Sequence, residues 1–250
     1  MATKTRRDQI LGLLRLRTSA SIHEMAERFS VSEMTIRRDL RHLHQSNRVI
    51  RIPNGAMIAP PVTFERTFQE RQRAMGDAKD RIGRAAASLV RPGESVVLDS
   101  GTTTLCIARH LHKVPNLIVI TFSVAILGEL GMDSSIRVEL TGGTYRRSSH
   151  DLVGEEVARG LTRVSAKKVF FGAAALSFHK GVMQFDPEAP RELMQAAAEK
   201  ILVLDSSKIG KEALYSFCKV EDCSLVVTDG GIRPHHLKRL RKLCRVHVAE

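Results

Sequence analysis

The sequence of 250 residues has no long apolar run, and this absence limits where the protein works. No stretch approaches the roughly eighteen apolar residues that a membrane span needs. The polar start, Met1 to Asp8, also lacks the apolar core of a signal peptide. We therefore expect a cytoplasmic protein that has no membrane partner.

Cysteine is also scarce, and its spacing excludes the usual disulfide and metal patterns. The chain has four cysteines: Cys106, Cys218, Cys223 and Cys244. They form no Cys-x-x-Cys pair and have no nearby histidine at zinc-ligand spacing. His235 and His236 are adjacent, and neighbours on a helix point about 100° apart, so they make a poor chelating pair. We expect reduced, mostly buried thiols, with no metal and no cofactor.

Positive charge, in contrast, is abundant. The formal net charge is +12. Residues 1–56 hold eleven Lys or Arg against five Asp or Glu, so +6 lies there and the other +6 is spread over residues 57–250. Such a surface favours a polyanion through counterion release, with an affinity that falls steeply with salt. RNA or an anionic membrane would also bind such a basic surface, so the partner has to be identified from a sequence motif.

The stretch Ser30–Leu43 (SVSEMTIRRDLRHL) predicts a helix that lies in a groove of duplex DNA. Ser32 suits an N-cap, and Ile36, Leu40 and Leu43 form one apolar stripe. The other face begins at the helix N-terminus, the end that helix-turn-helix proteins present to base edges and phosphates. That face carries Glu33, Met34, Thr35, Arg37, Arg38 and Arg41. Taken alone, the pattern also fits a surface helix with solvated arginines.

The neighbouring segments favour the DNA-binding alternative. Ile22–Phe29 reads as a short helix, and Asp8–Leu16 as an earlier one with Ile10, Leu13, Leu14 and Leu16 pointing inward. Arg48–Ala56 alternates apolar and basic residues and ends in Asn54-Gly55, a hairpin signal. Residues 1–57 are therefore predicted to form a winged helix-turn-helix whose wing brings Arg51 to the DNA backbone.

The rest of the chain predicts a linker and an α/β domain. Pro60-Pro61 marks a linker, and Phe64–Met75 reads as a connecting helix, so residues 58–76 separate the two domains. Residues 77–250 alternate apolar strands with helices, which indicates a mostly parallel sheet. The expected strands are 96–98, 117–121, 137–140, 169–171, 201–204 and 225–228. The expected helices are 77–89, 105–111, 123–130, 154–161, 191–199 and 237–243.

Ligands bind beyond the carboxyl ends of the strands in such a sheet. The first strand ends in Asp99-Ser100-Gly101-Thr102-Thr103-Thr104, whose backbone amides, hydroxyls and helix dipole suit a phosphate. An ordinary turn with a threonine N-cap would look the same. Other strand ends add hydroxyl, glycine, carboxylate and cationic groups: Thr121, Gly142, Gly143, Arg146, Gly172, Asp205 and Lys208. Together these groups predict a small anionic ligand rich in hydroxyls, such as a phosphorylated sugar.

Several motifs resemble the DeoR family of bacterial transcriptional regulators. They are the Thr-Ile-Arg-Arg-Asp-Leu run of Thr35–Leu40, LDSGTTT at 98–104, LTGGTYR at 140–146, VFFGA at 169–173 and LDSSKIG at 204–210. The resemblance implies a sensor domain similar in fold to ribose phosphate isomerases, and control by a sugar phosphate. Three stretches depart from the family pattern: Pro53–Ala56 in the wing, Phe122, and Gln184–Pro190 (QFDPEAP).

The sequence is compatible with three functions. The first is a repressor of carbohydrate genes that binds double-stranded operator DNA under the control of a phosphorylated sugar. The second is a sugar phosphate isomerase or deaminase using Asp99, Asp205, Lys208 and Glu188, although no compact acid/base group is visible. The third is a scaffold that has no small ligand. A repressor is expected to be a homodimer or homotetramer, because one helix-turn-helix reads a half-site.

Overall fold

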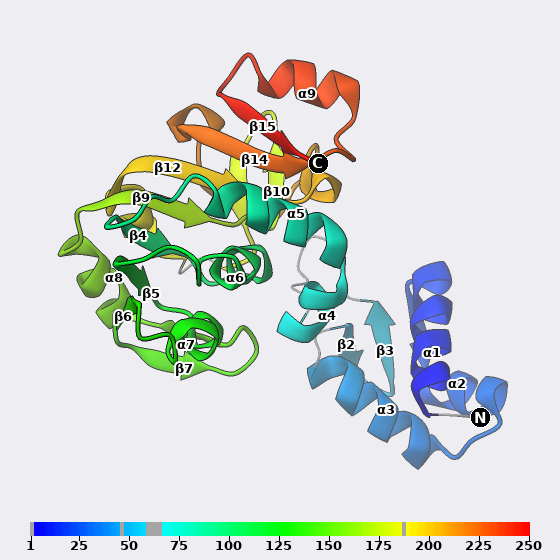
Figure 1. The fold of residues 1–250 in the computed structure, drawn as a ribbon. Coiled ribbons are helices and arrows are strands. Elements are labelled where there is room, and N and C mark those ends of the chain that lie inside the picture. The colour runs from blue at the N-terminus through cyan, green and yellow to red at the C-terminus, as the bar shows by residue number, and fades with distance from the viewer. Residues whose placement is uncertain (1–2, 46–47, 59–66, 187–188) are drawn as a thin grey trace. The chain divides into compact units, whose positions relative to one another are not determined.

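The computed structural model describes residues 3–45, 48–58, 67–186 and 189–250. The chain divides into two compact units, Met1–Arg66 and Thr67–Glu250 (Figure 1). Pro60-Pro61, Phe64 and Glu188 lie outside the described residues, so the linker boundaries at 58 and 76 stay a prediction.

The first unit contains helices and a small antiparallel sheet, as predicted for a winged helix-turn-helix. Its elements are α1 (Thr3–Arg17), β1 (Ser19–Ser21), α2 (Ile22–Phe29), α3 (Glu33–Gln45), β2 (Val49–Ile52) and β3 (Gly55–Ile58). The sheet has the order β1-β3-β2. Strand β1 was not predicted, because its three residues, Ser-Ala-Ser, carry almost no apolar signal.

The core of the first unit confirms the predicted stripe of α3. Ile36, Leu40 and Leu43 are buried against α1 and α2 side chains such as Ile10 and Met25. The expectation for Leu16 is wrong, since its side chain is 86% exposed. On a helix, position 16 lies about 240° from position 10, so it faces away from the buried stripe.

The wing turns one residue earlier than the Asn54-Gly55 signal predicts. Ile52 pairs with Gly55, which makes Pro53 and Asn54 the two central residues of the turn. Proline followed by a residue at positive φ, here Asn54 at 55°, is the combination of a type II turn. Gly55 lies in β3 instead, where a Cβ atom would come within 2.6 Å of the Ala20 carbonyl oxygen.

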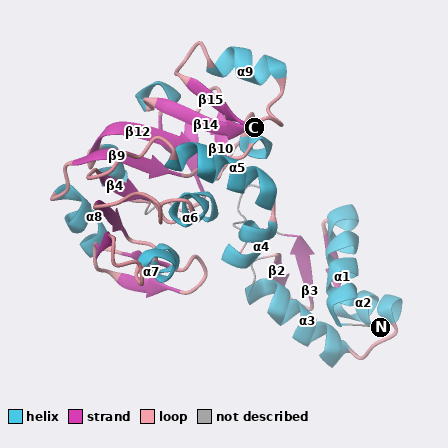
Figure 2. Cartoon of the chain, in the orientation of Figure 1, coloured by secondary structure: helices cyan, strands magenta, loops and turns pink. Residues whose placement is uncertain are grey.

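The second unit is built on a seven-stranded sheet (Figure 2). Its main strands are β4 (Ser95–Leu98), β5 (Leu117–Thr121), β6 (Ile136–Leu140), β9 (Ala166–Phe171), β12 (Ala197–Val203), β14 (Leu225–Asp229) and β15 (Val246–Ala249). Its α-helices are α4 (Phe68–Arg73), α5 (Gly76–Ala87), α6 (Thr102–Arg109), α7 (Val124–Leu130), α8 (Glu155–Thr162) and α9 (Pro234–Leu240).

All neighbouring strands of this sheet are parallel, in the order β15-β14-β12-β9-β4-β5-β6. The chain runs outward from β4 through β5 to β6, and then returns to β9 on the other side of β4. The order therefore reverses between β4 and β9. In open parallel sheets this switch point is where ligands bind.

Alternate side chains of the strands fill two cores, one on each face of the sheet. On one face Val97 and Phe171 pack with α8, α9 and a small sheet. On the other face Leu98 and Phe170 pack with α5, α6 and α7. Helices α5 and α6 touch closely, because a Cβ atom at Gly83 would lie 2.6 Å from a backbone carbon of Cys106.

Smaller elements complete the second unit. They are the hairpin β7 (Thr144–Arg146) and β8 (Asp151–Val153), the sheet β10 (Ala175–Ser177), β11 (Gly181–Gln184) and β13 (Tyr215–Cys218), and the 3-10 helices η2 (Arg191–Met194), η3 (Ser206–Lys208) and η4 (Val220–Asp222). The four cysteines are free thiols. In the part of the chain that is described, no helix is long and apolar enough to cross a membrane.

Three predicted helices differ from the structure, and one of them, expected near 237–243, is α9 (Pro234–Leu240). The helix expected over 191–199 is a 3-10 turn that ends at Met194, after which residues 197–200 belong to β12. The pairing of Ala197 with Ala166 in β9 overrides the helical propensity of this alanine-rich segment. The connecting helix begins at Phe68, because Thr67 accepts a hydrogen bond from the Glu70 amide and the Glu70 carboxylate accepts one from the Thr67 amide.

Candidate functional site

Helix α3 starts at the predicted N-cap. The Ser32 hydroxyl accepts a hydrogen bond from the Thr35 amide at 3.3 Å and shares a second one, 2.9 Å long, with the Thr35 hydroxyl. This satisfies one of the free amides in the first turn. The N-terminal end of the helix is thereby fixed with Thr35 half-buried beside Ser32.

The face of α3 opposite its apolar stripe is open to solvent. Its exposed side chains are Glu33, Met34, Arg37, Arg38 and Arg41, and Arg51 is exposed on the wing. Glu33 accepts a hydrogen bond from Arg37 at 3.4 Å, which holds that guanidinium along the helix. Among the described residues, neither Arg38 nor Arg41 pairs with a carboxylate. A cationic face of this kind can engage phosphates or base edges.

Asp39 has a structural role that the sequence analysis missed. It is 1% exposed, and its two carboxylate oxygens accept hydrogen bonds from Arg6 at 2.6 Å and Arg7 at 2.9 Å. Both arginines belong to α1, so this buried cluster fastens α1 to α3. It therefore sets the position of the helix that carries the candidate DNA contacts.

The candidate ligand site lies at the switch point of the second unit. Asp99 follows β4, and its carboxylate accepts a hydrogen bond from the Gly172 amide, which follows β9, at 2.9 Å. Burial raises the pKa of Asp99 to about 7. Hydrogen bonds from the backbone amides of Gly172 and Ser100 act in the opposite direction, and the nearby Asp151 raises the pKa further. Two of the predicted strand-end residues are thus in direct contact.

The N-terminus of α6 adjoins Asp99. Its N-cap is Gly101, which offers no side-chain cap, so the first amides of the helix have no partner from that residue. The Thr104 hydroxyl donates to the carbonyl oxygens of Asp99 at 2.7 Å and Gly101 at 3.0 Å, which fixes the turn. Thr102 and Thr103 are buried. The backbone of this turn, more than its hydroxyls, is suited to an anion.

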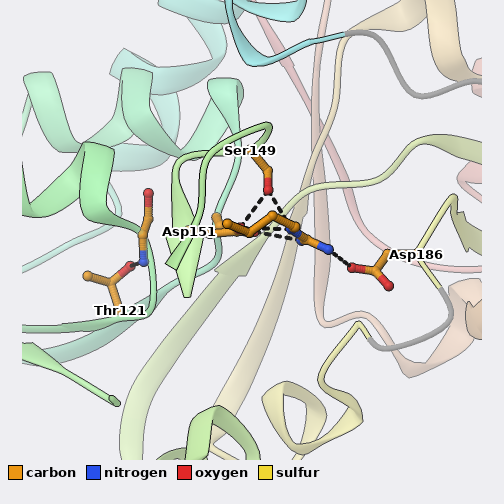
Figure 3. A network of polar contacts seen from close by, with 7 residues as sticks. Thr121, Ser149, Asp151 and Asp186 are labelled. Atoms are coloured by element: carbon orange, nitrogen blue, oxygen red, sulfur yellow. Dashed lines mark hydrogen bonds and ion pairs between the residues drawn. The ribbon is translucent and has the colours of Figure 1, made fainter. Parts of the chain in front are cut away.

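Arg146 is half-buried and engaged with acidic side chains of the protein. Its guanidinium donates to Asp151 at 2.9 Å and to Ser149 at 2.6 Å, and it also pairs with Asp186. Figure 3 shows Asp186 across from Ser149 and Asp151. The two carboxylates outweigh burial and hold the pKa of Arg146 above its ordinary value. Asp151 also accepts a hydrogen bond from Ser100 at 2.8 Å, which links this network to the turn after β4.

Two lysines bring positive charge to the same region. Lys208 donates to the Ala173 carbonyl oxygen at 2.7 Å and lies 4.0 Å from the Asp205 carboxylate. Lys79 of α5 is 3% exposed and donates to the Arg71 carbonyl oxygen. Burial and the charge of Lys208 lower the pKa of Lys79 to about 8. Lys79 was missed because it lies inside a predicted helix, far from any strand end in the sequence.

Other predicted residues support the site from a distance. The Thr121 hydroxyl donates to the Leu98 carbonyl oxygen at 2.7 Å. It accepts a hydrogen bond from the Ser123 amide at 3.0 Å, which Figure 3 shows at Thr121. Gly142 and Gly143 have φ values of 89° and 123°, which the turn before β7 requires. These three residues shape the backbone, and Thr121 is fully buried.

A pocket of about 280 Å³ lies near the switch point. It is lined by Gln184, Asp186, Arg191, Tyr215 and other residues of the β11–β13 region. Gln184 donates to the Gly172 carbonyl oxygen at 2.9 Å, so the pocket wall contacts the same residue that binds Asp99. The stretch that departs from the DeoR pattern, Gln184–Pro190, thus contributes to this wall.

Comparison with known proteins identifies both units. Residues 6–61 match the DeoR-like helix-turn-helix domain, and residues 75–230 match the DeoR C terminal sensor domain. The chain is 33% identical to an uncharacterized HTH-type transcriptional regulator, YgbI, of Escherichia coli, with 91% of this chain and 90% of that protein covered. It is 31% identical to the lactose phosphotransferase system repressor of Streptococcus mutans, with 92% and 93% covered.

A solved structure matches about half of the chain. Ribose 5-phosphate isomerase A from Methanocaldococcus jannaschii gives a TM-score of 0.40 at 16% identity, with 54% of this chain and 55% of that chain covered. The two relatives described above are named as a transcriptional regulator and a repressor. With both of its units matched over most of their length, the chain belongs to the DeoR family of transcriptional regulators.

Proposed function

We propose that this regulator represses carbohydrate genes, and that a phosphorylated sugar bound at the switch point of the sheet releases it from its operator. One observation carries the sensing half of the proposal. The carboxylate of Asp99 after β4 meets the Gly172 amide after β9, beside an α6 N-terminus without a side-chain cap. Such a place combines an acceptor for sugar hydroxyls with amides for an anion.

The DNA half of the proposal rests on α3 and the wing. Arg38 and Arg41 contact phosphates or guanine edges, and Arg37 does so from its bond to Glu33. Ser32 and Thr35 orient the N-terminal turn toward the bases. Arg51 reaches the adjacent backbone from the wing, where the exposed Pro53-Asn54 turn replaces the usual family ending.

Different groups of the protein are proposed to bind the phosphate and the hydroxyls of the sugar. The turn Ser100–Thr104 with the α6 dipole holds the phosphate, and Lys208 and Lys79 supply positive charge nearby. Asp99 and Asp205 accept hydrogen bonds from sugar hydroxyls. Arg146 acts by holding Asp151 and Asp186 in place, which follows from its bonds to both.

The pocket beside Gln184 and Asp186 is proposed to choose among sugars. Its volume of about 280 Å³ suits a small molecule, and its lining is partly polar. The name of the Streptococcus mutans relative, a lactose phosphotransferase system repressor, is consistent with a sugar-related signal. Because Gln184–Pro190 departs from the family pattern, this chain's sugar is expected to differ from that of relatives which keep the pattern.

The regulator is proposed to work as a homodimer or homotetramer. A single helix-turn-helix reads one half-site, and two-fold symmetry doubles the contact with a palindromic operator. For an effector to act, it has to bind one conformation or arrangement more tightly than another. Analytical ultracentrifugation of the full chain, alone and with duplex, measures the oligomeric state.

The proposal is tested by titrating the duplex upstream of this chain's gene with the protein, with and without pooled sugar phosphates. Release on adding the pool is the expected result, and fractionating the pool names the sugar. Binding that ignores the pool contradicts the sensing half and leaves the DNA half standing. A panel of aldose and ketose phosphates tested for turnover checks the enzyme alternative, for which no turnover is expected.

Replacing Arg38 by alanine is expected to weaken operator binding about 10- to 100-fold, because one phosphate or base contact is lost. Arg38 is exposed, so the fold is expected to remain intact. Electrophoretic mobility shifts measure the affinity, and circular dichroism measures the folding. Arg163→Ala, an exposed arginine of the second unit, is the control and should bind as the wild type does. Unchanged operator affinity in Arg38→Ala contradicts the assignment.

A further inference from the structure

The positive charge outside the first 56 residues is not spread evenly. Residues 230–249 contain six Lys or Arg and no Asp or Glu. Residues 57–229 contain 22 Lys or Arg and 21 Asp or Glu, so that long stretch is nearly neutral. The basic excess of the chain therefore lies in two places, the DNA-binding unit and the C-terminal segment around α9.

The six cations lie within thirteen residues on and beside α9, and we call them the α9 surface. Its members are Arg233, Lys238, Arg239, Arg241, Lys242 and Arg245, and all six are exposed. Among the residues that the structure describes, none of the six forms an ion pair with a carboxylate. Some exposed cations elsewhere in the same unit do have partners, as Lys180 has in Glu212 at 2.8 Å and Arg159 in Glu155 at 3.0 Å.

Packing fixes the direction in which this surface points. Leu240 is fully buried in the core on one face of the sheet, and Leu237 and Leu243 pack against that core. The helix lies at the β15 edge of the sheet (Figure 1). Since the apolar side of α9 is held inward, its cations cannot turn away from solvent.

Cations of the α9 surface also act on a neighbouring histidine. Burial lowers the pKa of His236, and the neighbouring His235, Arg233 and Arg239 lower it further. The Arg239 guanidinium stacks 4.5 Å above the centre of the Phe178 ring, which holds this charge in place. Exposed cations without carboxylate partners, so close together in the chain, give a surface suited to a polyanion.

We propose that the α9 surface binds the phosphate backbone of duplex DNA, as a second contact in addition to the helix-turn-helix. The proposal goes beyond the contacts of α3 and the wing, and it rests on the chain being a DNA-binding regulator. DNA is favoured because it is the polyanion that the first unit of the same chain holds. Once that unit is bound, the α9 surface works at high effective concentration, so weak phosphate contacts add to the affinity.

The test compares two triple variants of the full chain on the duplex upstream of this chain's gene. In the first, Lys238→Gln, Arg241→Gln and Lys242→Gln remove three charges of the α9 surface and leave Arg239 on Phe178. In the matched control, Lys113→Gln, Arg163→Gln and Lys219→Gln remove three exposed charges elsewhere in the second unit. Both variants have the same net charge, and thermal melting checks that both are folded. The quantity measured is the slope of log affinity against log salt.

The expected result is a shallower slope for the α9 variant only. Each lost phosphate contact reduces the slope by about 0.9, so three contacts reduce it by up to about 2.7. Between about 50 and 200 mM salt, the wild type would then lose up to about 40-fold more affinity than the α9 variant. If the triple variant melts early, the single variant Lys242→Gln, with an expected change of about 0.9, takes its place.

Equal slopes for the α9 variant and the control overturn the proposal. If the wild type fails to bind the duplex at all, both this proposal and the proposed function fail, whereas equal slopes on a well-bound duplex overturn only the α9 contact. A further arm tests sedimentation with vesicles of phosphatidylcholine and phosphatidylserine. Vesicle binding that only the α9 variant loses, with an unchanged DNA slope, assigns the surface to lipid and overturns the DNA contact.

Discussion

Replacing Asp39 by alanine is expected to destabilise the first unit by about 3 kcal/mol, because it leaves two arginines facing each other without their shared carboxylate. Asp39 is 1% exposed and bonds to Arg6 at 2.6 Å and Arg7 at 2.9 Å. The value lies at the low end for a broken buried pair, since the arginine side chains are 11% and 23% exposed and can reach water. For a unit of this size, such a loss is a large part of the total stability.

Hydrogen exchange of the full chain measures this effect within the first unit alone. Amides of α1, α2 and α3 are expected to lose about 100-fold in protection, while those of the second unit keep theirs. Glu33→Ala on the same helix is the control, because its pair with Arg37 at 3.4 Å is exposed and worth under about 0.5 kcal/mol. Unchanged protection in Asp39→Ala would mean that the cluster does not hold α1 against α3.

The contrast between α3 and Asp39 shows what local sequence can predict. The apolar stripe of Ile36, Leu40 and Leu43 repeats within one helix, so its burial follows from spacing alone. The partners of Asp39 are 32 and 33 residues away in the sequence, and its neighbouring residues do not indicate them. Its position next to Leu40 on the border of the stripe was the one available sign of burial.

In the second unit, most strands of the seven-stranded sheet could be predicted, and those of the small sheet could not. Leu117–Thr121 was predicted with its observed bounds because its residues are almost all apolar. The strands β10, β11 and β13 are three or four residues long, and they form because they pair with one another across the chain. Strand β12 begins at Ala197 for the same reason, since its neighbour β9 decides its length.

The sequence predicted which residues lie at the candidate site, but not which of them contact one another. The strand-end rule led to Asp99 and Gly172, which the structure joins at 2.9 Å. The rule does not tell which charges are already paired. Arg146 therefore looked free for a phosphate although Asp151 and Asp186 hold it, and Lys79 of α5 was overlooked.

Asp99→Asn is expected to remove a pH dependence of stability that the wild type has. Burial raises the pKa of Asp99 to about 7, while the unfolded chain keeps the ordinary 3.8. The folded state therefore binds the proton more tightly. The stabilisation that Asp99 contributes is fully present below about pH 4, declines as the pH rises, and stops declining once the pH passes about 7. From pH 5 to pH 8 this single group costs about 2.5 kcal/mol of unfolding free energy.

Urea unfolding at pH 5 and pH 8 measures this cost, and the asparagine variant should show a change smaller by about 2.5 kcal/mol. The amide oxygen of asparagine still accepts the hydrogen bond from Gly172, so the turn after β4 is expected to persist. Glu155→Gln, an exposed carboxylate with an 88% exposed side chain, is the control and should follow the wild type. If the free energy of unfolding declines equally from pH 5 to pH 8 in the wild type and in Asp99→Asn, Asp99 is already ionised at pH 5. The switch point would then hold a permanent negative charge, which opposes a phosphate there and favours a ligand bound through its hydroxyls.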